Sequence, residues 1–549
     1  MEDVGVAIEE SFDVLYSAVL KYSGKKMRNS ARTLLRKINI YLFCAIYAMG
    51  YACPLYAGDN PDKQYQGFNK EAFIESAKEK KVLNIGLVDC IAFALKNNSE
   101  IRIKRIDPKI KEDDVKIAKS DFEPTFKVGA SYADNKEQSS STLFSSDVST
   151  SEKTDFNAGV EGKLITGTEY DISFGNTKYK SNASNQVINP YHDSDAVITI
   201  TQPLLKGAGI VVNRADIIIA QNDKGKSLEE FRDETMAVIS KTKTAYFDYI
   251  YFIRRHKIAR IFLDWTKELL VITKARYAKG LASSVDLLEI ESAVAEREKE
   301  LIAFESSLKK AEDELKLVTN LVDDPELWNA QILPIDQPEL SVEKVNLVES
   351  LENAFQYRPD YISKNIELKS KDIKIKVAKN NVYPAVDLIG SFGLNGLGDK
   401  YREALRSIDD RDYRDWGVGI KVSIPWGGGD RADFDKKKLE KMQALLELKR
   451  LEQNIILEVR DRVRAIDIQY RQVEASRLLE EKQSKNYKAQ EKRFRAGQLS
   501  THDLLEYRFR LAMAELEHIK ALIDYNVALI ELDKAQGLTL VKNDVTLEE

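Results

Sequence analysis

The chain has 549 residues, a formal net charge of −5 and a mean hydropathy of −0.38, with 31% charged residues. The negative charge argues against general nucleic-acid binding, which needs a basic face, and a hydropathy scan alone would class such a chain as soluble. This length ordinarily indicates several domains, but an internal repeat described below indicates one extended structure in two halves.

The N-terminal segment has the pattern of a secretory signal peptide. Six lysines and arginines between positions 25 and 37 precede the apolar run 38–49, and small residues follow it. An apolar run of 12 residues is too short to span a bilayer, which needs about 20. Met27 lies directly before this pattern, so residues 1–26 are interpreted as a start-site artefact, with a genuine extension as the alternative. Residues 1–57 are thus predicted to be an extension plus signal peptide.

The three cysteines predict no intramolecular disulfide in the mature chain. Cys44 lies in the apolar run, and Cys53 lies just after it. Cys53 is a weak candidate for lipidation, because the three residues before it, Gly-Tyr-Ala, lack the aliphatic residue of a lipobox. Only Cys90 would then remain, so stability must come from packing and oligomerisation.

The second half of the chain repeats the first. Residues 83–132 align on 343–392 at an offset of 260, and 276–288 align on 493–505 at an offset of 217. The offsets differ by 43, so the first copy holds 43 additional residues, which predict one more hairpin, either added to the barrel inferred below or projecting from it on the outside of the cell. Two copies of helix, strands and long helices indicate a pseudo-symmetric wall rather than a compact catalytic globule.

Alternating segments of about ten residues, separated by loops rich in Ser, Thr and Asn, indicate strands of an outer-membrane β-barrel. A secreted β-domain would show a similar pattern. Two or three hairpins cannot close a barrel alone, whereas several protomers together could. The predicted strands are 125–132, 155–164, 169–176 and 196–202 within 125–202, and 385–392 and 415–424 within 385–424, with loops at 137–153 and 178–190.

Long helices with coiled-coil seams are predicted on either side of the strands. Apolar residues recur at heptad spacing from Leu287 to Val318, and the second copy shows two such seams. A purely structural coiled coil fits these seams equally well. In the first short helix, Pro108 predicts a kink or break, because an interior proline costs about 3 kcal/mol. The predicted long helices are 213–274 and 284–320 in the first copy, and 430–492 and 501–537 in the second.

Each pair of long helices is predicted to turn at a helical tip. A glycine allows the left-handed exit of the first helix, a hydroxyl caps the next one, and an aspartate suits its positive end. The tip residues are Gly280, Leu281, Ser284 and Asp286 in the first copy, and Gly497, Leu499, Thr501 and Asp503 in the second.

No pattern in the chain indicates an enzyme or a bound cofactor. The run 426–430 is glycine-rich but lacks the Gly-Lys-Ser/Thr ending of a phosphate loop, so it is interpreted as a strand-to-helix bend. The four histidines show no metal-ligand spacing, and His518 takes a seam position that predicts an interhelical hydrogen bond. No nucleophile elbow, HExxH or paired-cysteine zinc motif occurs.

The helices, strands and tips described above occur in the same order in both copies. In this arrangement the chain resembles TolC-type outer-membrane efflux proteins over about 83–540. The resemblance implies a fold of mixed α and β, mainly α: a trimeric outer-membrane β-barrel continued by a long periplasmic α-helical barrel, built from two structural repeats. It places the repeats at 83–320 and 346–537, an equatorial linker at 321–345 and a C-terminal tail at 538–549. The segments that carry it are Leu87–Asn98, Ala118–Pro124, Thr201–Gly207, Ser423–Gly428 and the two Arg-aromatic-x-x-Gly tips.

The family implies the outer-membrane channel of a tripartite efflux or type I secretion system, a passive exit duct in a Gram-negative-type cell. Its partners would be two further copies, a periplasmic adaptor, an inner-membrane transporter and outer-membrane lipid, with no nucleic acid. The alternative is a secreted periplasmic coiled-coil scaffold or adaptor. An adaptor would need a lipoyl-like or small β-barrel domain between its helices, and the sequence shows none.

The resemblance also implies an aperture at the helical tips, ringed by carboxylates of the second copy. The matching residues are Asp503 and Glu506, which share one helix face, with Asp286 in line from the first copy. Six carboxylates in a trimer would favour cations. The alternative is that Asp503 only caps a helix and Glu506 is solvated. Leu499 and Phe494 depart from the family's latch residues, which leaves Arg495, Ser500 or Thr501 as candidates.

Overall fold

The computed structural model describes residues 82–138, 148–183, 186–411, 413–496 and 498–547. The chain divides into two units, Met1–Glu71 and Ala72–Glu549. The predicted extension and signal peptide at 1–57, and the candidate lipidation site at Cys53, lie outside the described residues. All the described residues belong to the second unit.

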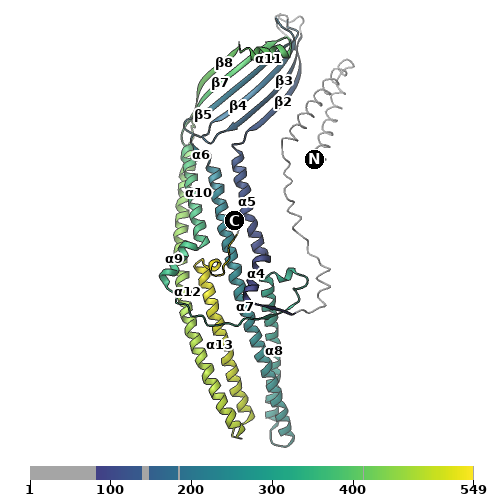
Figure 1. Cartoon of the computed structure of the whole chain (residues 1–549), viewed down its shortest axis with the longest axis vertical. Helices are drawn as coiled ribbons and strands as arrows, with labels where there is room; N and C mark the ends of the chain where they lie inside the picture. Colours follow the sequence, from purple (N-terminus) through teal and green to yellow (C-terminus); the bar gives the residue numbers. More distant parts are fainter. Residues whose placement is uncertain (1–81, 139–147, 184–185, 412, 497, 548–549) are drawn as a thin grey trace, which may run out of the picture. The chain divides into compact units, whose positions relative to one another are not determined.

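Two long helical hairpins form most of this unit (Figure 1). The first pairs α7 (Ala215–Ala278) with α8 (Ser284–Val318), and the second pairs α12 (Gly429–Arg495) with α13 (Thr501–Ala535). Helix α13 also packs against α7, which joins the two hairpins. Helices α8 and α13 contain the predicted heptad seams, because apolar side chains at alternating three- and four-residue spacing must be buried against a neighbouring helix.

The shorter helices come in two pairs that break at equivalent positions: α4 (Leu87–Asn97) with α5 (Ser99–Ser120), and α9 (Leu347–Tyr357) with α10 (Pro359–Asn381). Of the kink or break predicted at Pro108, the break is wrong, because α5 continues through that residue. The break lies instead at Asn98, whose side chain accepts hydrogen bonds from the N–H groups of Glu100 and Ile101 and so caps α5.

The start of α5 lies against the end of α8. The Nδ2 atom of Asn98 donates a 2.8 Å hydrogen bond to the carbonyl oxygen of Val318, the last residue of α8. The Nδ2 atom of Asn320 donates to the carbonyl oxygen of Asn97 at 2.9 Å. Both bonds satisfy carbonyls that helix ends leave without partners, so α8 and α5 stack end to end alongside the longer α7.

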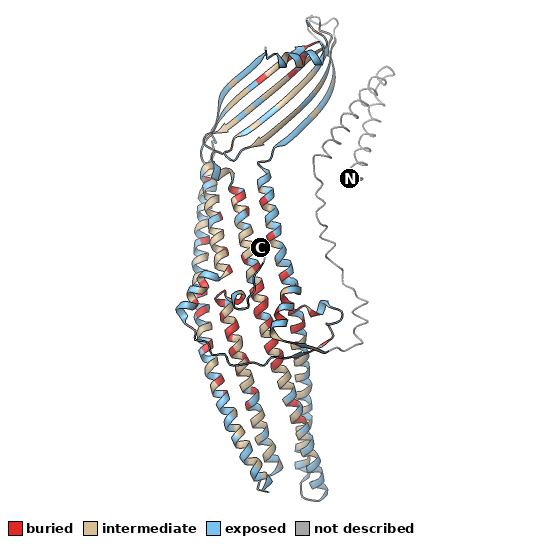
Figure 2. Cartoon of the chain, in the orientation of Figure 1, coloured by how far each residue is buried: buried red, intermediate tan, exposed pale blue. Residues whose placement is uncertain are grey.

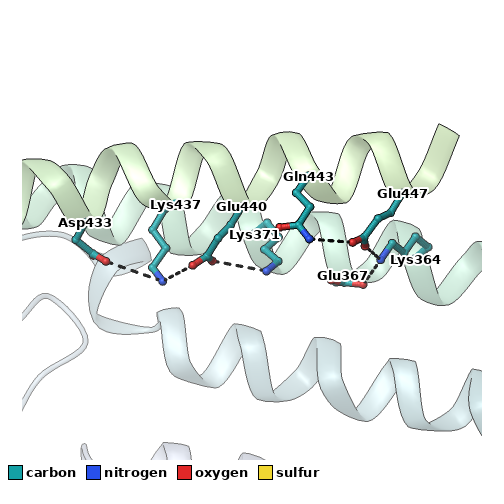
Figure 3. Close-up of polar contacts among 8 residues, drawn as sticks. All are labelled: Lys364, Glu367, Lys371, Asp433, Lys437, Glu440, Gln443 and Glu447. Carbon is teal, nitrogen blue, oxygen red and sulfur yellow. Dashed lines mark hydrogen bonds and ion pairs between the residues drawn. The ribbon is translucent and has the colours of Figure 1, made fainter. Parts of the chain in front are cut away.

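A ladder of charged side chains joins α10 to α12 (Figure 3). Lys364 of α10 lies 2.9 Å from Glu367 and 2.7 Å from Glu447 of α12. Further along, Lys371 lies 3.7 Å from Glu440, which also pairs with Lys437 at 3.3 Å. Partly exposed pairs of this kind contribute roughly 0–1 kcal/mol each, so the ladder sets which residues of the two helices lie opposite one another more than it stabilises the fold.

The six main strands form one antiparallel sheet in the order β2-β3-β4-β5-β7-β8. The strands extend beyond the segments in which apolar and polar residues alternate. The predicted loops 137–153 and 178–190 are therefore too long, because strand residues occupy part of each. The additional hairpin predicted for the first copy is confirmed: β3 and β4 lie within the sheet, between β2 and β5. The strand bounds are Thr125–Gln138, Val148–Lys163, Glu169–Ser181, Tyr191–Pro203, Ala385–Gly398 and Arg414–Ser423.

A second, parallel sheet of β1 (Val82–Ile85) and β6 (Gln331–Pro334) lies against α7. The hydroxyl of the fully buried Tyr246 lies 3.3 Å from the carbonyl oxygen of Ile85, and that of Tyr249 donates to the carbonyl oxygen of Ile332 at 2.8 Å. Figure 2 shows buried residues concentrated on the helices around this small sheet. Short elements complete the unit: α6 (Ile210–Asn213), the 3-10 turn η2 (Leu321–Asp323), α11 (Tyr401–Asp409) and α14 (Thr539–Lys542).

Candidate functional site

The six-stranded sheet has one apolar face that runs across all its strands. Successive side chains of a strand point to opposite faces, and the register puts Phe126 opposite Val160, and Phe392 between Ile198 and Trp416. The face is uncovered, because Phe126, Trp416 and Ile420 are 72%, 75% and 67% exposed. Its large apolar residues are Phe126, Val128, Tyr132, Phe156, Val160, Tyr170, Ile172, Phe174, Ile198, Ile200, Val386, Leu388, Phe392, Leu394, Trp416, Val418, Ile420 and Val422.

The opposite face of the same sheet is polar and mainly acidic. At its helix-side end it lines a hollow of about 520 Å³ with Glu161, Lys163, Glu169 and Asp171. The charged residues on this face are Lys127, Glu137, Lys153, Asp155, Glu161, Lys163, Glu169, Asp171, Asp193, Asp195, Asp387, Asp415 and Lys421. One sheet therefore carries an apolar face and a polar face on which acidic residues outnumber basic ones.

None of the helices in the described ranges is long and apolar enough to cross a bilayer.

Helix α11 covers the end of the sheet that is remote from the long helices, on the apolar-face side. Ala404 is fully buried, and a Cβ atom at Gly396 of β7 would lie 2.0 Å from its carbonyl oxygen. The rings of Tyr401 and His192 lie 6.3 Å apart. This helix was not predicted from the sequence, although the spacing of Tyr401, Leu405 and Ile408 gives the signal of an amphipathic helix.

The first helical tip is closed by backbone hydrogen bonds and a capping box. Gly280 has φ of +70°, and the N–H of Leu281 donates to the carbonyl oxygen of Arg276 at 2.9 Å. The cap of α8 is Ser283, so the prediction of Ser284 is one residue late. Asp286 decides this, because its carboxylate accepts from the N–H of Ser283 at 2.7 Å while its own N–H donates to the Ser283 hydroxyl at 3.2 Å. Hydrogen bonds from Ser283, helped by the charge of Arg276, lower the pKa of Asp286.

The second tip repeats this arrangement. The N–H of Gln498 donates to the carbonyl oxygen of Arg493 at 2.9 Å, and Ser500, rather than the predicted Thr501, caps α13. The Ser500 hydroxyl accepts from the N–H of Asp503 at 3.1 Å and donates to its carboxylate at 2.6 Å. Leu499 is half-buried, and Gly497 lies outside the described residues.

The two tips of one protomer lie side by side around a hollow of about 360 Å³. Leu281 and Asp286 line it from the first tip, and Ser500 and His502 from the second. Glu506 is not part of its lining and pairs instead with Arg510, at 2.5 Å on the next turn of α13.

Two of the latch candidates have partners within their own tip. Arg495 pairs with Glu491 at 2.8 Å, and the Ser500 hydroxyl is bonded to Asp503.

The remaining sequence signals have structural roles. The Nδ1 atom of His518 lies 3.2 Å from the Ser476 hydroxyl of α12, which confirms the predicted interhelical hydrogen bond. The glycine-rich run lies between the end of β8 at Ser423 and the start of α12 at Gly429, which confirms the strand-to-helix bend. Within the described ranges, no group of three His, Cys, Asp or Glu side chains could hold a metal ion.

Two relatives of this chain are similar to it over more than half of its length. It is 24% identical over 317 residues to outer membrane protein OprJ of Pseudomonas aeruginosa, covering 57% of this chain and 63% of OprJ. It is 23% identical over 310 residues to nodulation protein T of Rhizobium leguminosarum bv. trifolii, covering 55% of this chain and 63% of that protein. The chain thus spans a little under two thirds of the length of these two relatives.

The fold is shared with the Campylobacter jejuni CmeC outer membrane channel. That structure superposes with a TM-score of 0.61 at 16% identity, over 82% of this chain and 86% of CmeC. The family model for outer membrane efflux protein matches residues 171–321 and 351–538, which is more than half of the chain. The chain therefore belongs to the outer membrane efflux protein family, a non-enzymatic family of outer-membrane proteins.

Proposed function

We propose that three copies of this chain form a passive exit duct through the outer membrane and periplasm, for solutes delivered by an inner-membrane pump through a periplasmic adaptor. The observation that carries the proposal is the two-faced sheet. One face carries the 18 large apolar residues named above and is suited to contact lipid. The other face is polar and mainly acidic and is suited to line an aqueous lumen. In a soluble coiled-coil scaffold, an apolar face of this size would be exposed to water, which is unfavourable.

The sheet requires copies of itself to close. Its outer strands, β2 and β8, have unpaired edges in the protomer, which in hydrocarbon would leave backbone groups without partners. Three copies of a six-stranded sheet would give a barrel of eighteen strands, and barrels of roughly 16–18 strands enclose an aqueous channel. The β3–β4 hairpin would thus widen the barrel.

The long helices would continue this lumen into the periplasm, with the tips as its aperture and as the adaptor contact. Equivalent stacking of α5 on α8 and of α10 on α13 supports two structural repeats within each protomer. In this arrangement Asp503, Glu506 and Asp286 would face the opening, and Gly280, Leu281, Ser284, Gly497, Leu499 and Thr501 would contact the adaptor. The energy for export would come from the pump.

The test is ion conduction by the purified full chain in planar lipid bilayers. We expect stepwise channels that favour cations, because acidic residues outnumber basic ones on the polar face. A protein that remains a soluble periplasmic monomer and never conducts would refute the proposal. Crosslinking in cells, followed by identification of the inner-membrane partner, would separate a drug efflux system from a type I secretion system.

A further inference from the structure

The apolar face of the sheet ends at α11. Along β7 its last apolar side chain is Leu394, and along β5 it is Ala196. The next residues on the same face, Gly396 and Ser194, lie two positions further from the long helices, and both are buried. The backbone of Ala404 in α11 covers Gly396. Helix α11 therefore lies on the outer, apolar side of the sheet at the border of its apolar band, and not on the polar face.

The exposed side of α11 carries two arginines. Ala404 and Ile408 face the sheet, and Arg402 and Arg406, four residues apart, share the opposite side of the helix and are exposed. Among the described residues, neither guanidinium group has a hydrogen-bond or ion-pair partner. Asp409, at the end of the helix, and Glu403, at its side, are acidic neighbours.

Further residues at this border have the character of a membrane–water interface. On β8, Arg414 lies on the same face as Trp416, opposite Leu394, the last apolar residue of this face on β7. Tyr401 and Tyr413 are 45% and 64% exposed beside it. Aromatic girdles mark the interfaces of transmembrane barrels, and an amphipathic helix with basic residues on its polar side lies in the plane of an interface.

We propose that Arg402 and Arg406 bind the phosphate groups of phosphorylated lipids in the outer leaflet of the outer membrane. This inference rests on the proposed function, because it requires the apolar face to contact lipid. The planar guanidinium group matches phosphate oxygens with paired hydrogen bonds. Two guanidinium groups one helical turn apart, projecting from the barrel wall just above the hydrocarbon, face the level at which headgroup phosphates lie.

The test uses the full chain, purified as a detergent-stable oligomer, with bis-phosphorylated lipid A as the probe and native mass spectrometry as the readout. The test variant is Arg402→Gln with Arg406→Gln. The matched control is Lys163→Gln with Lys421→Gln, which removes the same charge from the polar face of the same sheet. We expect the test variant to bind lipid A at least tenfold more weakly than the wild type, and the control to bind it like the wild type.

A second arm uses enzymatically dephosphorylated lipid A with the wild-type protein, so the result does not depend on how well a variant folds. We expect the dephosphorylated lipid to bind at least tenfold more weakly. Equal binding of the two lipids by the wild type, or of lipid A by wild type and test variant, would overturn the inference. An oligomer that conducts ions but does not distinguish the lipids refutes only this inference, whereas failure to form a conducting oligomer refutes the proposed function.

Discussion

Arg358 donates a hydrogen bond from its Nη1 atom to the carbonyl oxygen of Ala535, at 3.2 Å. Arg358 precedes α10 and Ala535 ends α13, so this contact joins α13 to α10 as Asn98 joins α8 to α5. The offsets read from the sequence, 260 and 217, relate Asn98 to Arg358 and Val318 to Ala535. The same joint is thus built twice, once with an amide and once with a guanidinium group.

The second joint should depend strongly on its arginine. Arg358 also pairs with Asp360 at 2.8 Å and Glu458 at 2.7 Å, and its side chain is only 15% exposed. Burial disfavours its charge, but these two carboxylates raise the pKa of Arg358 above its ordinary value. Removing one partner of a buried pair costs about 3–5 kcal/mol. The cost should be lower here, because Asp360 and Glu458 are partly exposed and water can solvate them once the arginine is removed. We therefore expect Arg358→Ala to lower the free energy of unfolding by about 2 kcal/mol.

Thermal unfolding of the purified oligomer checks this expectation. Arg462→Ala is the control on the same helix as Glu458, because Arg462 and its partner Glu531 are 41% and 32% exposed, and such a pair contributes roughly 0–1 kcal/mol. Equal destabilisation by the two substitutions would show that the joint at Arg358 stabilises the fold no more than an exposed ion pair does.

The apolar face predicts how the sheet responds to added charge. Ile420→Arg places a guanidinium group in the middle of that face on β8, where it should cost about 2–4 kcal/mol in lipid. Ser173→Arg places the same group on the polar face of β4, where water reaches it. We expect the first variant to accumulate much less in the outer membrane and the second to insert normally, as measured by fractionation and detergent extraction. Equal insertion would contradict the assignment of the faces.

The tip carboxylates predict ion selectivity. In a narrow aperture, Asp503 and Glu506 would attract cations and repel anions, so Asp503→Asn with Glu506→Gln should lower the cation-to-anion permeability ratio in planar bilayers. Asp467→Asn, an exposed carboxylate on α12 paired with Arg471, is the control and should leave the ratio unchanged. An unchanged ratio in the tip variant would remove both residues from the aperture.

Cys90 predicts a pH-dependent chemical readout of the fold. Burial, followed by the charges of Asp89 and Asp336, raises the pKa of the Cys90 thiol to about 12. Because the thiolate is the reactive form, we expect N-ethylmaleimide at pH 8 to modify Cys90 roughly 10³-fold more slowly in the folded chain than in denaturant. The pKa of the thiol is higher in the folded chain than in the unfolded chain, so the protonated Cys90 favours the folded state. This contribution to the free energy of unfolding is fully present below pH 9 and is lost as the pH rises towards 12.

The labelling is measured by mass spectrometry in a Cys53→Ser background, with Cys90→Ser as the blank. Rapid modification of the folded protein at pH 8 would place Cys90 at the surface.

Features set by periodicity could be predicted from the sequence, and features set by tertiary contacts could not. The seam from Leu287 to Val318 locates α8, because buried apolar spacing is a local signal. The strand ends were missed because beyond the apolar band both faces are polar, as at Glu137 and Lys180, and only the hydrogen-bond ladder to a neighbouring strand shows that the chain is still extended.

The helix joints and tips show the same limit. A proline in sequence pointed to a break at Pro108, but the capping bonds of Asn98 and its contact with Val318, 220 residues away, place the break elsewhere. At the tips, either of two adjacent serines could cap α8, and the reciprocal bonds of Asp286 select Ser283. For helix α11 the apolar spacing gave a local signal, but its position against the sheet depends on Gly396, where the absence of a side chain lets the backbone of Ala404 approach.

The most direct test of the whole account is electron cryo-microscopy of the full chain extracted from outer membranes in detergent. The account predicts a three-fold particle in which one eighteen-stranded barrel opens into a single helical tunnel, with the β3–β4 hairpin in the barrel wall. A solitary protomer whose sheet edges pair with each other and enclose no lumen would contradict it.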